Sequence, residues 1–250
     1  MLDLQGKVAI VTGSGRGIGK DIAKLLKDLH AEVVISDVDA SLAKDTAESI
    51  GTTWVQADVT KPEDVHNLVQ HVLTTYGHID VLVNNAGIMG LSKLEDISLD
   101  QWNKMMAVHL TGTFLCSQAV LPVMKEQHYG KIINISSNWG QRGAAEAVHY
   151  CTAKAGIIGF TRALAREVAA DGILVNSVAP GPIETDMISE EARLLNTTVE
   201  EVRKNLTAGI PLGKLGSTLD VAAAVAFLAS EMGNFFCGQI VAPNGGEVMM

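Results

Sequence analysis

Short apolar runs alternate along the chain with longer segments in which apolar side chains recur every three or four residues. The short runs show no polar alternation, which indicates strands that are covered on both faces. They predict strands at residues 7–12, 32–37, 53–57, 79–83, 131–136, 173–179 and 239–242. The longer segments have the period of amphipathic helices, and they predict helices at residues 18–29, 40–50, 62–76, 99–127, 148–170 and 219–230.

The regular alternation of strands and helices predicts the fold class. Strands joined by helices pair in parallel through right-handed crossovers, with helices on both faces of the sheet. We therefore expect a doubly wound α/β architecture with a parallel sheet of about seven strands. Neither a repeat nor a linker interrupts the pattern, which predicts a single domain over residues 1–250. Residues 181–213 are polar and interrupted, and so long a loop predicts a substrate lid at about residues 183–213.

The composition narrows the range of functions. The formal net charge is -9, with 47% hydrophobic and 4% aromatic residues. The apolar content argues against disorder, and the acidic charge argues against nucleic acid or an anionic membrane surface as a partner. The longest apolar window, at residues 221–229, is too short to cross a membrane. The first residues lack the basic and apolar pattern of a secretory signal.

The 3 cysteines, Cys116, Cys151 and Cys237, lie far apart and show no CxxC spacing. Neither zinc nor any other metal site is therefore predicted. We expect reduced thiols that pack in the interior, as is typical of a cytoplasmic protein.

Residues 12–19 (TGSGRGIG) join the first predicted strand to the first predicted helix. Glycine allows a positive φ and a close approach of the backbone to a ligand. The free amide groups and the dipole at the start of the helix favour a negatively charged group there. A tight turn alone also uses glycine, but the strand–turn–helix context favours a site for the pyrophosphate of a dinucleotide.

Asp37 ends the second predicted strand, about 20 residues beyond the glycine loop, where an acidic side chain binds the ribose 2′-hydroxyl in dinucleotide sites. A carboxylate there repels a 2′-phosphate, which favours NAD over NADP. Arg16 is a signal in the other direction, because a cation in the loop attracts that phosphate, whereas Val38 supplies no second cation. The alternative role for Asp37 is a cap for the following helix.

A series of further motifs follows the loop. In chain order the motifs are Thr12-Gly13 with Gly17-Ile18-Gly19, Asp58-Val59, Asn84-Asn85-Ala86-Gly87, Ser137, Tyr150-Cys151-Thr152-Ala153-Lys154, Asn176, and Pro180-Gly181 with Thr185. Together, and over nearly the whole chain, they resemble the short-chain dehydrogenases/reductases, above all the 3-oxoacyl-carrier-protein reductases and the sugar, polyol and small-alcohol dehydrogenases. The resemblance implies a Rossmann-type fold and hydride transfer between a nicotinamide cofactor and a small-molecule substrate.

Three functions follow from this resemblance. The first is an NAD-dependent oxidoreductase that acts on a secondary alcohol or ketone, such as a sugar, a polyol or a small polar alcohol. The second is an NADPH-dependent reductase of 3-oxoacyl thioesters. The third is a dinucleotide-binding protein without catalytic activity. We place the NAD-dependent oxidoreductase first, since the full set of reacting residues is present.

Tyr150 and Lys154 are four residues apart on a predicted helix and so share one face. An ammonium beside a phenol stabilises the phenolate and lowers the phenol pKa, which suits acid–base work near neutrality. Packing with an extended lysine is the alternative. Ser137 ends a strand, where ligands bind in open α/β sheets. By resemblance, Tyr150 exchanges a proton with the substrate oxygen, Ser137 binds that oxygen and Lys154 holds the nicotinamide ribose.

The residues expected to contact the cofactor combine the loop, the second strand and the family motifs. They are Gly13, Ser14, Arg16, Gly17, Ile18, Gly19, Asp37, Val38, Asp58, Val59, Asn85, Ala86, Gly87, Tyr150, Lys154, Pro180, Gly181, Ile183 and Thr185. The residues expected to contact the substrate are Ser137, Trp139, Arg142 and Tyr150. Arg142 is suited to an anionic substrate group, although a solvated loop or a subunit contact explains it equally well.

His109 departs from the family pattern, which usually has Asn at this position to support a water chain that relays protons to the lysine. An imidazole can also relay protons, so we expect His109 to act in catalysis. A slower enzyme and a noncatalytic relative are the alternatives. The resemblance also implies a homotetramer or homodimer, formed through the helices at 99–127 and 148–170.

Overall fold

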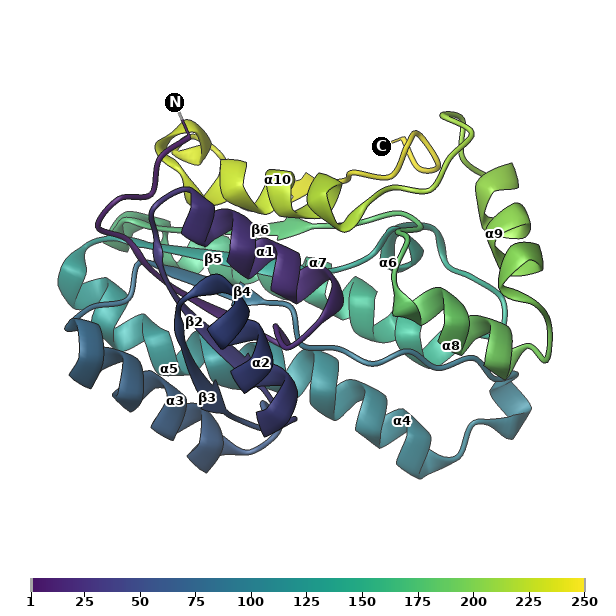
Figure 1. Cartoon of the computed structure of the whole chain (residues 1–250), viewed down its shortest axis with the longest axis horizontal. Coiled ribbons are helices and arrows are strands. Elements are labelled where there is room, and N and C mark those ends of the chain that lie inside the picture. Colours follow the sequence, from purple (N-terminus) through teal and green to yellow (C-terminus); the bar gives the residue numbers. More distant parts are fainter. Residues whose placement is uncertain (1, 250) are drawn as a thin grey trace.

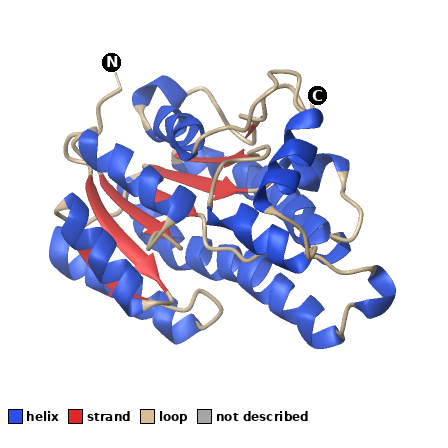
Figure 2. Ribbon diagram, turned by 45° about the vertical axis from the view of Figure 1, so that its right-hand side comes forward, coloured by secondary structure: helices blue, strands red, loops and turns tan. Residues whose placement is uncertain are grey.

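The computed structural model describes residues 2–249 and contains a seven-stranded parallel sheet with the order β3-β2-β1-β4-β5-β6-β7. The strands are β1 (Val8–Thr12), β2 (Glu32–Asp37), β3 (Thr53–Gln56), β4 (Val81–Asn84), β5 (Gly130–Ile135), β6 (Ile173–Val178) and β7 (Ile240–Val241). Every neighbouring pair is parallel. Figure 2 shows the strands between two layers of helices. The predicted Rossmann-type α/β fold is confirmed.

Helices cover both faces of the sheet because the strand residues alternate between two apolar cores. On one face lie α1 (Gly17–Asp28), α2 (Ala40–Ile50) and α10 (Thr218–Ala229), and on the other lie α3 (Pro62–Tyr76), α5 (Gly112–Gln127) and α7 (Val148–Val168). In β1, Ala9 and Val11 face the first layer, while Val8 and Ile10 face the second. The helices α1 and α10 lie side by side above the sheet in Figure 1.

The sequence predicted one long helix at residues 99–127, but the structure divides this segment. It consists of α4 (Leu99–Met106), one π-helical turn (Ala107–Thr111) and α5. By length and apolar composition this 29-residue stretch could cross a membrane. Its residues Cys116, Val120 and Met124 are buried against the sheet, however, so it is a core helix. This stretch, and not residues 221–229, is therefore the longest apolar helix among the described residues.

The lid segment contains two helices, α8 (Asp186–Leu194) and α9 (Val199–Ala208), where the sequence analysis expected a long loop. They pack on each other through a small apolar cluster that includes Ile188 and Val202. Thr198 caps α9 by accepting a hydrogen bond from the Glu201 amide. That cap is a sequence signal for a helix start, which the polar composition of the segment obscured.

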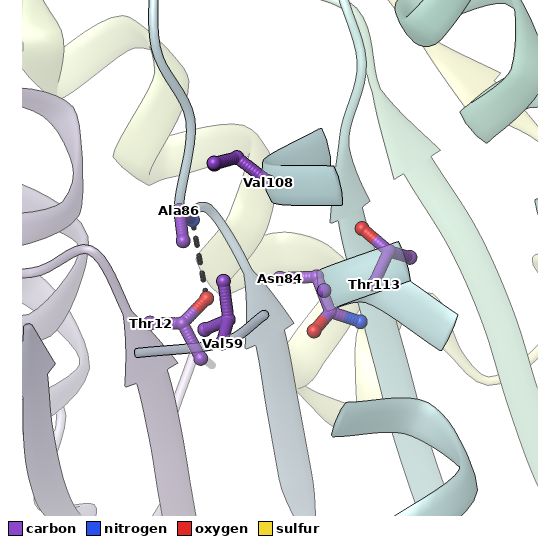
Figure 3. Close-up of a pocket in the computed structure, with 7 residues that line it drawn as sticks. Thr12, Val59, Asn84, Ala86, Val108 and Thr113 are labelled. Carbon is purple, nitrogen blue, oxygen red and sulfur yellow. Dashed lines mark hydrogen bonds between the residues drawn. The ribbon is translucent and has the colours of Figure 1, made fainter. Parts of the chain in front are cut away.

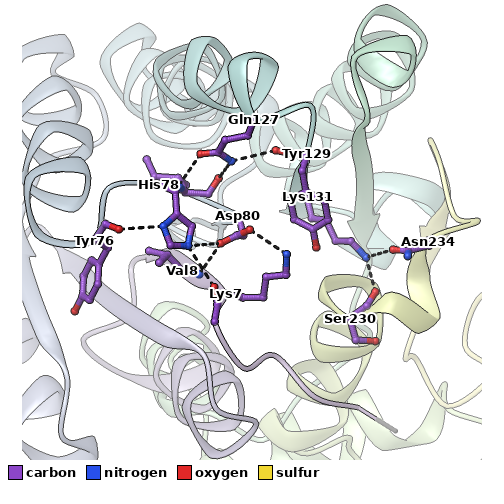
Figure 4. Close-up of polar contacts among 12 residues, drawn as sticks. Lys7, Val8, Tyr76, His78, Asp80, Gln127, Tyr129, Lys131, Ser230 and Asn234 are labelled. Carbon is purple, nitrogen blue, oxygen red and sulfur yellow. Dashed lines mark hydrogen bonds and ion pairs between the residues drawn. The ribbon is translucent and has the colours of Figure 1, made fainter.

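The amino ends of the central strands are closed by a buried polar network (Figure 4). The Lys7 ammonium lies 3.1 Å from a carboxylate oxygen of Asp80. The Lys131 ammonium donates to the Ser230 carbonyl and, at 2.7 Å, to the side-chain oxygen of Asn234. Burial lowers the pKa of Lys131 to about 8. This network joins β5 to the segment after α10, at the edge of the sheet opposite the predicted site.

Candidate active site

Three of the four predicted catalytic side chains, Ser137, Tyr150 and Lys154, meet at the carboxyl end of β5. Ser137 follows this strand, and Tyr150 and Lys154 lie one helical turn apart in α7, on the same face. The Lys154 ammonium donates to the Ile135 carbonyl at 2.8 Å and lies 5.7 Å from the centre of the Tyr150 ring. Ser137 and Lys154 are both buried. The fold thus brings these side chains together.

The acidities of Tyr150 and Lys154 differ from the sequence-based expectation. Burial raises the pKa of Tyr150 to about 12, against the opposing effect of a hydrogen bond with Ser137. Burial also lowers the pKa of Lys154 to about 7. The expected lowering of the Tyr150 pKa by Lys154 is therefore wrong for this structure, since burial dominates and the ammonium is directed to a carbonyl. Such a phenol keeps its proton near neutral pH.

His109 lies in the π-helical turn, and only 1% of its surface is exposed. Its Nε2 lies 2.9 Å from the Ile88 carbonyl oxygen and 3.2 Å from the Ile88 amide nitrogen. Its ring meets that of Tyr150 edge to face at 5.5 Å between centroids. Burial, then the nearby charge of Lys154, lowers the pKa of His109 to about 3. The imidazole is therefore uncharged near neutral pH.

The Nδ1 atom of His109 is buried and has no hydrogen-bond partner among residues 2–249. Unpaired buried polar atoms are uncommon and costly in native proteins, and π-helical turns occur frequently at functional sites. Both observations set the π turn apart from the rest of the core.

The glycine loop has the geometry that a pyrophosphate requires. Gly13 and Gly17 have φ angles of +61° and +56°, in the left-handed region. A Cβ atom at Gly13 would lie 2.7 Å from the Ala86 Cα. The first turn of α1 has no acidic residue, and the Arg16 side chain does not cap it. Its amide groups therefore remain available to an anion, so these residues fit a dinucleotide.

Thr12 joins the glycine loop to the turn at residues 84–87. Its hydroxyl oxygen accepts hydrogen bonds from the amides of Asn85 and Ala86, each at 3.1 Å. The Asn85 side chain in turn donates to the carbonyls of Thr12 and Gly13, each at 2.9 Å. Figure 3 shows the gap beside this junction, which has no room for a water molecule. The gap is therefore a packed junction, and Thr12, which the sequence analysis named only as part of the glycine-loop motif, is a supporting residue.

Asp37 lies at the end of β2 with its carboxylate against the glycine loop. One oxygen accepts a hydrogen bond from the Gly15 amide at 2.9 Å, and the other accepts one from the Asp39 amide at 3.1 Å. Val38 is exposed beside it (62%), and Arg16 is also exposed. The fold places all these residues on the side of the loop expected for the adenosine.

Ser14 behaves differently from its prediction as a cofactor contact. Its side chain is fully buried, and its hydroxyl donates to the Val11 carbonyl at 2.6 Å and accepts from the Ser36 amide at 3.1 Å. The hydroxyl is therefore committed to the junction of β1 and β2. Ile18 is half-buried and Gly19 is buried in α1.

The remaining predicted cofactor contacts follow the carboxyl ends of the strands. Asp58 comes after β3, where its carboxylate accepts hydrogen bonds from Thr60, and Val59 beside it is buried. Gly87 completes the turn after β4. Pro180, Gly181, Ile183 and Thr185 come after β6, and Thr185 precedes α8 without capping it by its side chain.

A contact that the sequence analysis missed surrounds Ser137. The Ser137 hydroxyl donates to the side-chain oxygen of Asn138 at 3.2 Å, and the Asn138 amide donates to Glu247. Arg142 donates to the other Glu247 oxygen at 2.6 Å. Arg142 is therefore not free to bind an anion, which was one of the roles considered for it, because Glu247 neutralises it. No sequence signal joins these residues, which lie 105 positions apart.

Trp139 packs edge to face on Tyr150, with ring centroids 5.9 Å apart, so it forms a wall beside the predicted catalytic phenol. The Cys151 thiol contacts the Ala144 carbonyl, and burial raises its pKa, which favours packing over reactivity. Within residues 2–249, no three side chains of His, Cys, Asp or Glu are grouped as a metal site requires.

The chain is similar to known proteins over nearly its whole length. A family model described as Enoyl-(Acyl carrier protein) reductase matches residues 13–247. The 3-oxoacyl-(acyl-carrier-protein) reductase of Vibrio cholerae is 41% identical over 251 residues, which cover 100% of both chains. The reductases of the same name from Aquifex aeolicus and Escherichia coli are 40% and 37% identical and cover 98% and 100% of both chains.

Proposed function

The chain belongs to the short-chain dehydrogenase/reductase family, and from this membership we propose that it reduces the 3-oxo group of an acyl thioester with a nicotinamide dinucleotide. It is an oxidoreductase that acts on a CH–OH group with NAD(P). The full-length identity of about 40% to 3-oxoacyl-(acyl-carrier-protein) reductases carries the choice of substrate. The sugar, polyol or small-alcohol substrate that the sequence analysis placed first becomes the second candidate, favoured only by the polar side chains after Ser137.

The proposed chemistry is divided among three side chains. When bound along residues 13–19 and 85–87, the nicotinamide dinucleotide supplies the hydride. Ser137 donates a hydrogen bond to the carbonyl oxygen of the substrate, on which negative charge develops. Tyr150 donates its proton to the same oxygen, and its raised pKa keeps that proton in place at neutral pH until then. Lys154 then stabilises the phenolate that remains.

His109 supports the loop after β4 and the Tyr150 ring as a neutral group. Its depressed pKa argues against a role in which the imidazole becomes charged during turnover. Ser137 and Lys154 are buried, and the partly buried Tyr150 lies beside them, which argues against a noncatalytic dinucleotide-binding protein. His109 therefore acts as a positioning residue in this proposal.

The cofactor that the site favours is NADH. The Asp37 carboxylate lies at the loop, where it accepts a ribose hydroxyl and repels a 2′-phosphate. The exposed Arg16 is the opposing signal, since a cation in the loop attracts a 2′-phosphate. NADPH, the cofactor of the second hypothesis from the sequence, is the alternative.

A substrate panel tests the proposed function. The purified protein is mixed with NADH or NADPH and a 3-oxoacyl thioester such as acetoacetyl thioester, and the loss of reduced nicotinamide absorbance is followed. A 2-enoyl thioester of the same length is the matched control, and polyols with NAD test the second candidate. Turnover of polyols in the absence of any turnover of the 3-oxoacyl thioester would reject the proposed substrate.

We also place the protein in the cytoplasm as a homotetramer or homodimer. The 3 unpaired cysteines support a reducing compartment. Phe114 and Val148, on α5 and α7, are 45% and 38% exposed, which supports contact of these helices with a second copy.

A further inference from the structure

A hollow of about 340 Å³ opens next to the catalytic cluster, between α6 (Asn138–Arg142), the lid helix α9 and the C-terminal segment. Its walls are formed by Arg142, Asn205, Leu206, Gly209 and Glu247. Ser137 itself does not line the hollow, but Asn138 connects the two, since it is hydrogen-bonded both to Ser137 and to the wall residue Glu247. A volume of this size accommodates the part of a substrate that extends beyond its carbonyl group.

The Glu247 carboxylate is built into the wall of this hollow. Its side chain is only 9% exposed, and its two oxygens accept hydrogen bonds from Arg142, at 2.6 Å, and from Asn138. Asn138 is 2% exposed. Because the side-chain oxygen of Asn138 faces Ser137, its NH₂ group must face Glu247. Two hydrogen bonds thus separate the carboxylate from the catalytic hydroxyl.

The backbone that carries Glu247 is held in place as well. The Glu247 amide donates to the Asn244 carbonyl at 3.2 Å, and the Asn244 side chain donates to the Val248 carbonyl at 2.8 Å and accepts from the Gly246 amide at 2.9 Å. Asn244 is itself buried. The turn therefore fixes the position of the carboxylate.

The charges around the hollow cancel. Arg142 is the only cation among the wall residues, and it is paired with Glu247. α9 carries two cations nearby: Arg203 is bound to Glu184 at 2.6 Å, and the exposed Lys204 is not part of the wall. An anionic group that enters the hollow would meet the Glu247 carboxylate and would have to displace a charge-assisted hydrogen bond to reach Arg142.

We propose that Glu247 determines substrate specificity by charge: it occupies Arg142 and thereby excludes acyl substrates that end in a carboxylate or another anion. Neutral acyl chains enter the hollow, whereas anionic chains of similar size are rejected. The repulsion acts on binding, since Glu247 does not touch the reacting atoms. This inference rests on the proposed function for the identity of the substrate, but the charge filter itself is a property of the hollow.

The first test compares two 3-oxoacyl thioesters of equal length, one with a methyl end and one with a carboxylate end. In Glu247→Gln, which keeps the shape and removes the charge, kcat/KM for the carboxylate substrate relative to the methyl substrate should rise about tenfold or more. Adding Arg142→Gln to this variant should abolish the gain. Glu126→Gln makes the same charge change at an exposed position of α5. It is the control and should leave the ratio unchanged.

The second test does not depend on turnover. Titration calorimetry with monomethyl glutarate, an anion, and with dimethyl glutarate, its neutral analogue, measures binding directly. Glu247→Gln should acquire affinity for the anion that the unaltered protein lacks, and Arg142→Gln should remove it. If Glu247→Gln does not fold, Glu247→Ser, too short to reach Arg142, gives the same readout.

The outcomes of these tests distinguish a failure of the proposed function from a failure of the charge filter. A protein that turns over neither thioester contradicts the proposed function, and the titrations then decide on the filter alone. An unaltered protein that binds the anion as tightly as Glu247→Gln, or an unchanged substrate ratio in both Glu247 variants, overturns the filter.

Discussion

The surroundings of Tyr150 explain why this phenol stays protonated near neutral pH. The rings of His109 and Trp139 meet it edge to face at 5.5 and 5.9 Å between centroids. Burial raises the pKa of Tyr150 to about 12, while a hydrogen bond with Ser137 opposes the shift. An acid of this strength retains its proton until negative charge develops on an adjacent oxygen.

Replacing Tyr150 by Phe should lower kcat with the active substrate by at least about 10²-fold. The ring remains, so packing against His109 and Trp139 is preserved and the thermal unfolding midpoint should change little. Tyr129→Phe is the matched control, because it removes a hydroxyl at the other end of the sheet and keeps the ring against Lys7. Equal turnover of Tyr150→Phe and the unaltered protein would contradict the assigned role.

His109→Asn should retain or raise turnover, since the imidazole acts as a neutral positioning group. The variant should also change the acid stability. The pKa of His109 is about 3 in the folded protein and 6.5 as its ordinary value. Between these values the unfolded chain binds a proton that the folded protein does not. The unaltered protein therefore loses stability as the pH falls below 6.5, by at most about 1.4 kcal/mol per pH unit from this group.

Urea unfolding at about pH 5 and about pH 7.5 measures this effect. The difference between the two unfolding free energies should be smaller in His109→Asn than in the unaltered protein. Complete loss of activity in a folded His109→Asn protein would instead show that the imidazole has an indispensable role of its own.

Asp37→Ala should shift the cofactor preference toward NADPH. Removing the carboxylate removes its repulsion of the 2′-phosphate and leaves Arg16 to attract it. The ratio of kcat/KM for NADPH to that for NADH should rise about tenfold or more. Asp39→Ala, which removes a carboxylate two residues further along, is the control variant. A strong NADPH preference in the unaltered protein would reject the argument from Asp37.

At the scale of the elements, the periodicity of apolar residues predicts the helices and strands that bury one or two of their faces. The strands of the sheet and the long helices were predicted because their apolar residues repeat along continuous segments. The two lid helices were missed, since polar residues dominate α8 and α9 and only their contact with each other buries an apolar face. The π turn was also missed, because the burial of His109 against the loop after β4 is a tertiary contact.

In the candidate site, too, the contacts that depend on tertiary structure were not predicted. The glycine loop and the Ser137, Tyr150 and Lys154 cluster were predicted from local motifs on predicted elements. The pairing of Arg142 with Glu247 was not, since it depends on how the C-terminal turn folds back onto α6. The pKa of Tyr150 was predicted in the wrong direction, because helical spacing does not report how deeply a side chain is buried.

The glycine loop permits a paired test of backbone strain and crowding. Gly13 and Gly17 both have positive φ, but a Cβ atom would meet the Ala86 Cα 2.7 Å away at Gly13 and open space at Gly17. Gly17→Ala should therefore cost about 1 kcal/mol of unfolding free energy. Gly13→Ala should cost clearly more, because it combines that strain with a backbone clash. Urea unfolding of both variants checks the order, and equal losses would contradict it.

At the scale of the whole molecule, the two ends of the sheet differ in what they carry. The candidate reacting groups and the hollow lie beyond the carboxyl ends of the strands, whereas the amino ends are closed by the network around Lys131 (Figure 4). The net charge of -9 thus describes the molecule on average. The predicted site holds Lys154 in the interior and balances Arg142 with Glu247.

Lys131→Met should lower the unfolding free energy by about 1–3 kcal/mol near neutral pH, because it leaves the Ser230 carbonyl without its donor. The folded pKa of Lys131 is about 8, below its ordinary 10.5. The unfolded chain therefore binds more protons between these values, so this group adds stability as the pH rises from 8 to 10.5. That gain should be absent in Lys131→Met, as measured by urea unfolding, while turnover at neutral pH stays unchanged.

The polar network at the amino ends of the strands also affects which stabilising substitutions the protein can tolerate. Stabilising substitutions near an active site often cost activity, because reactive groups need strained or desolvated surroundings. Here the Lys131 ammonium, which holds the turn after α10 to β5, lies at the opposite edge of the sheet from the proposed catalytic phenol of Tyr150. Substitutions that stabilise the network at the amino ends of the strands should therefore raise the thermal stability of the protein without lowering its activity.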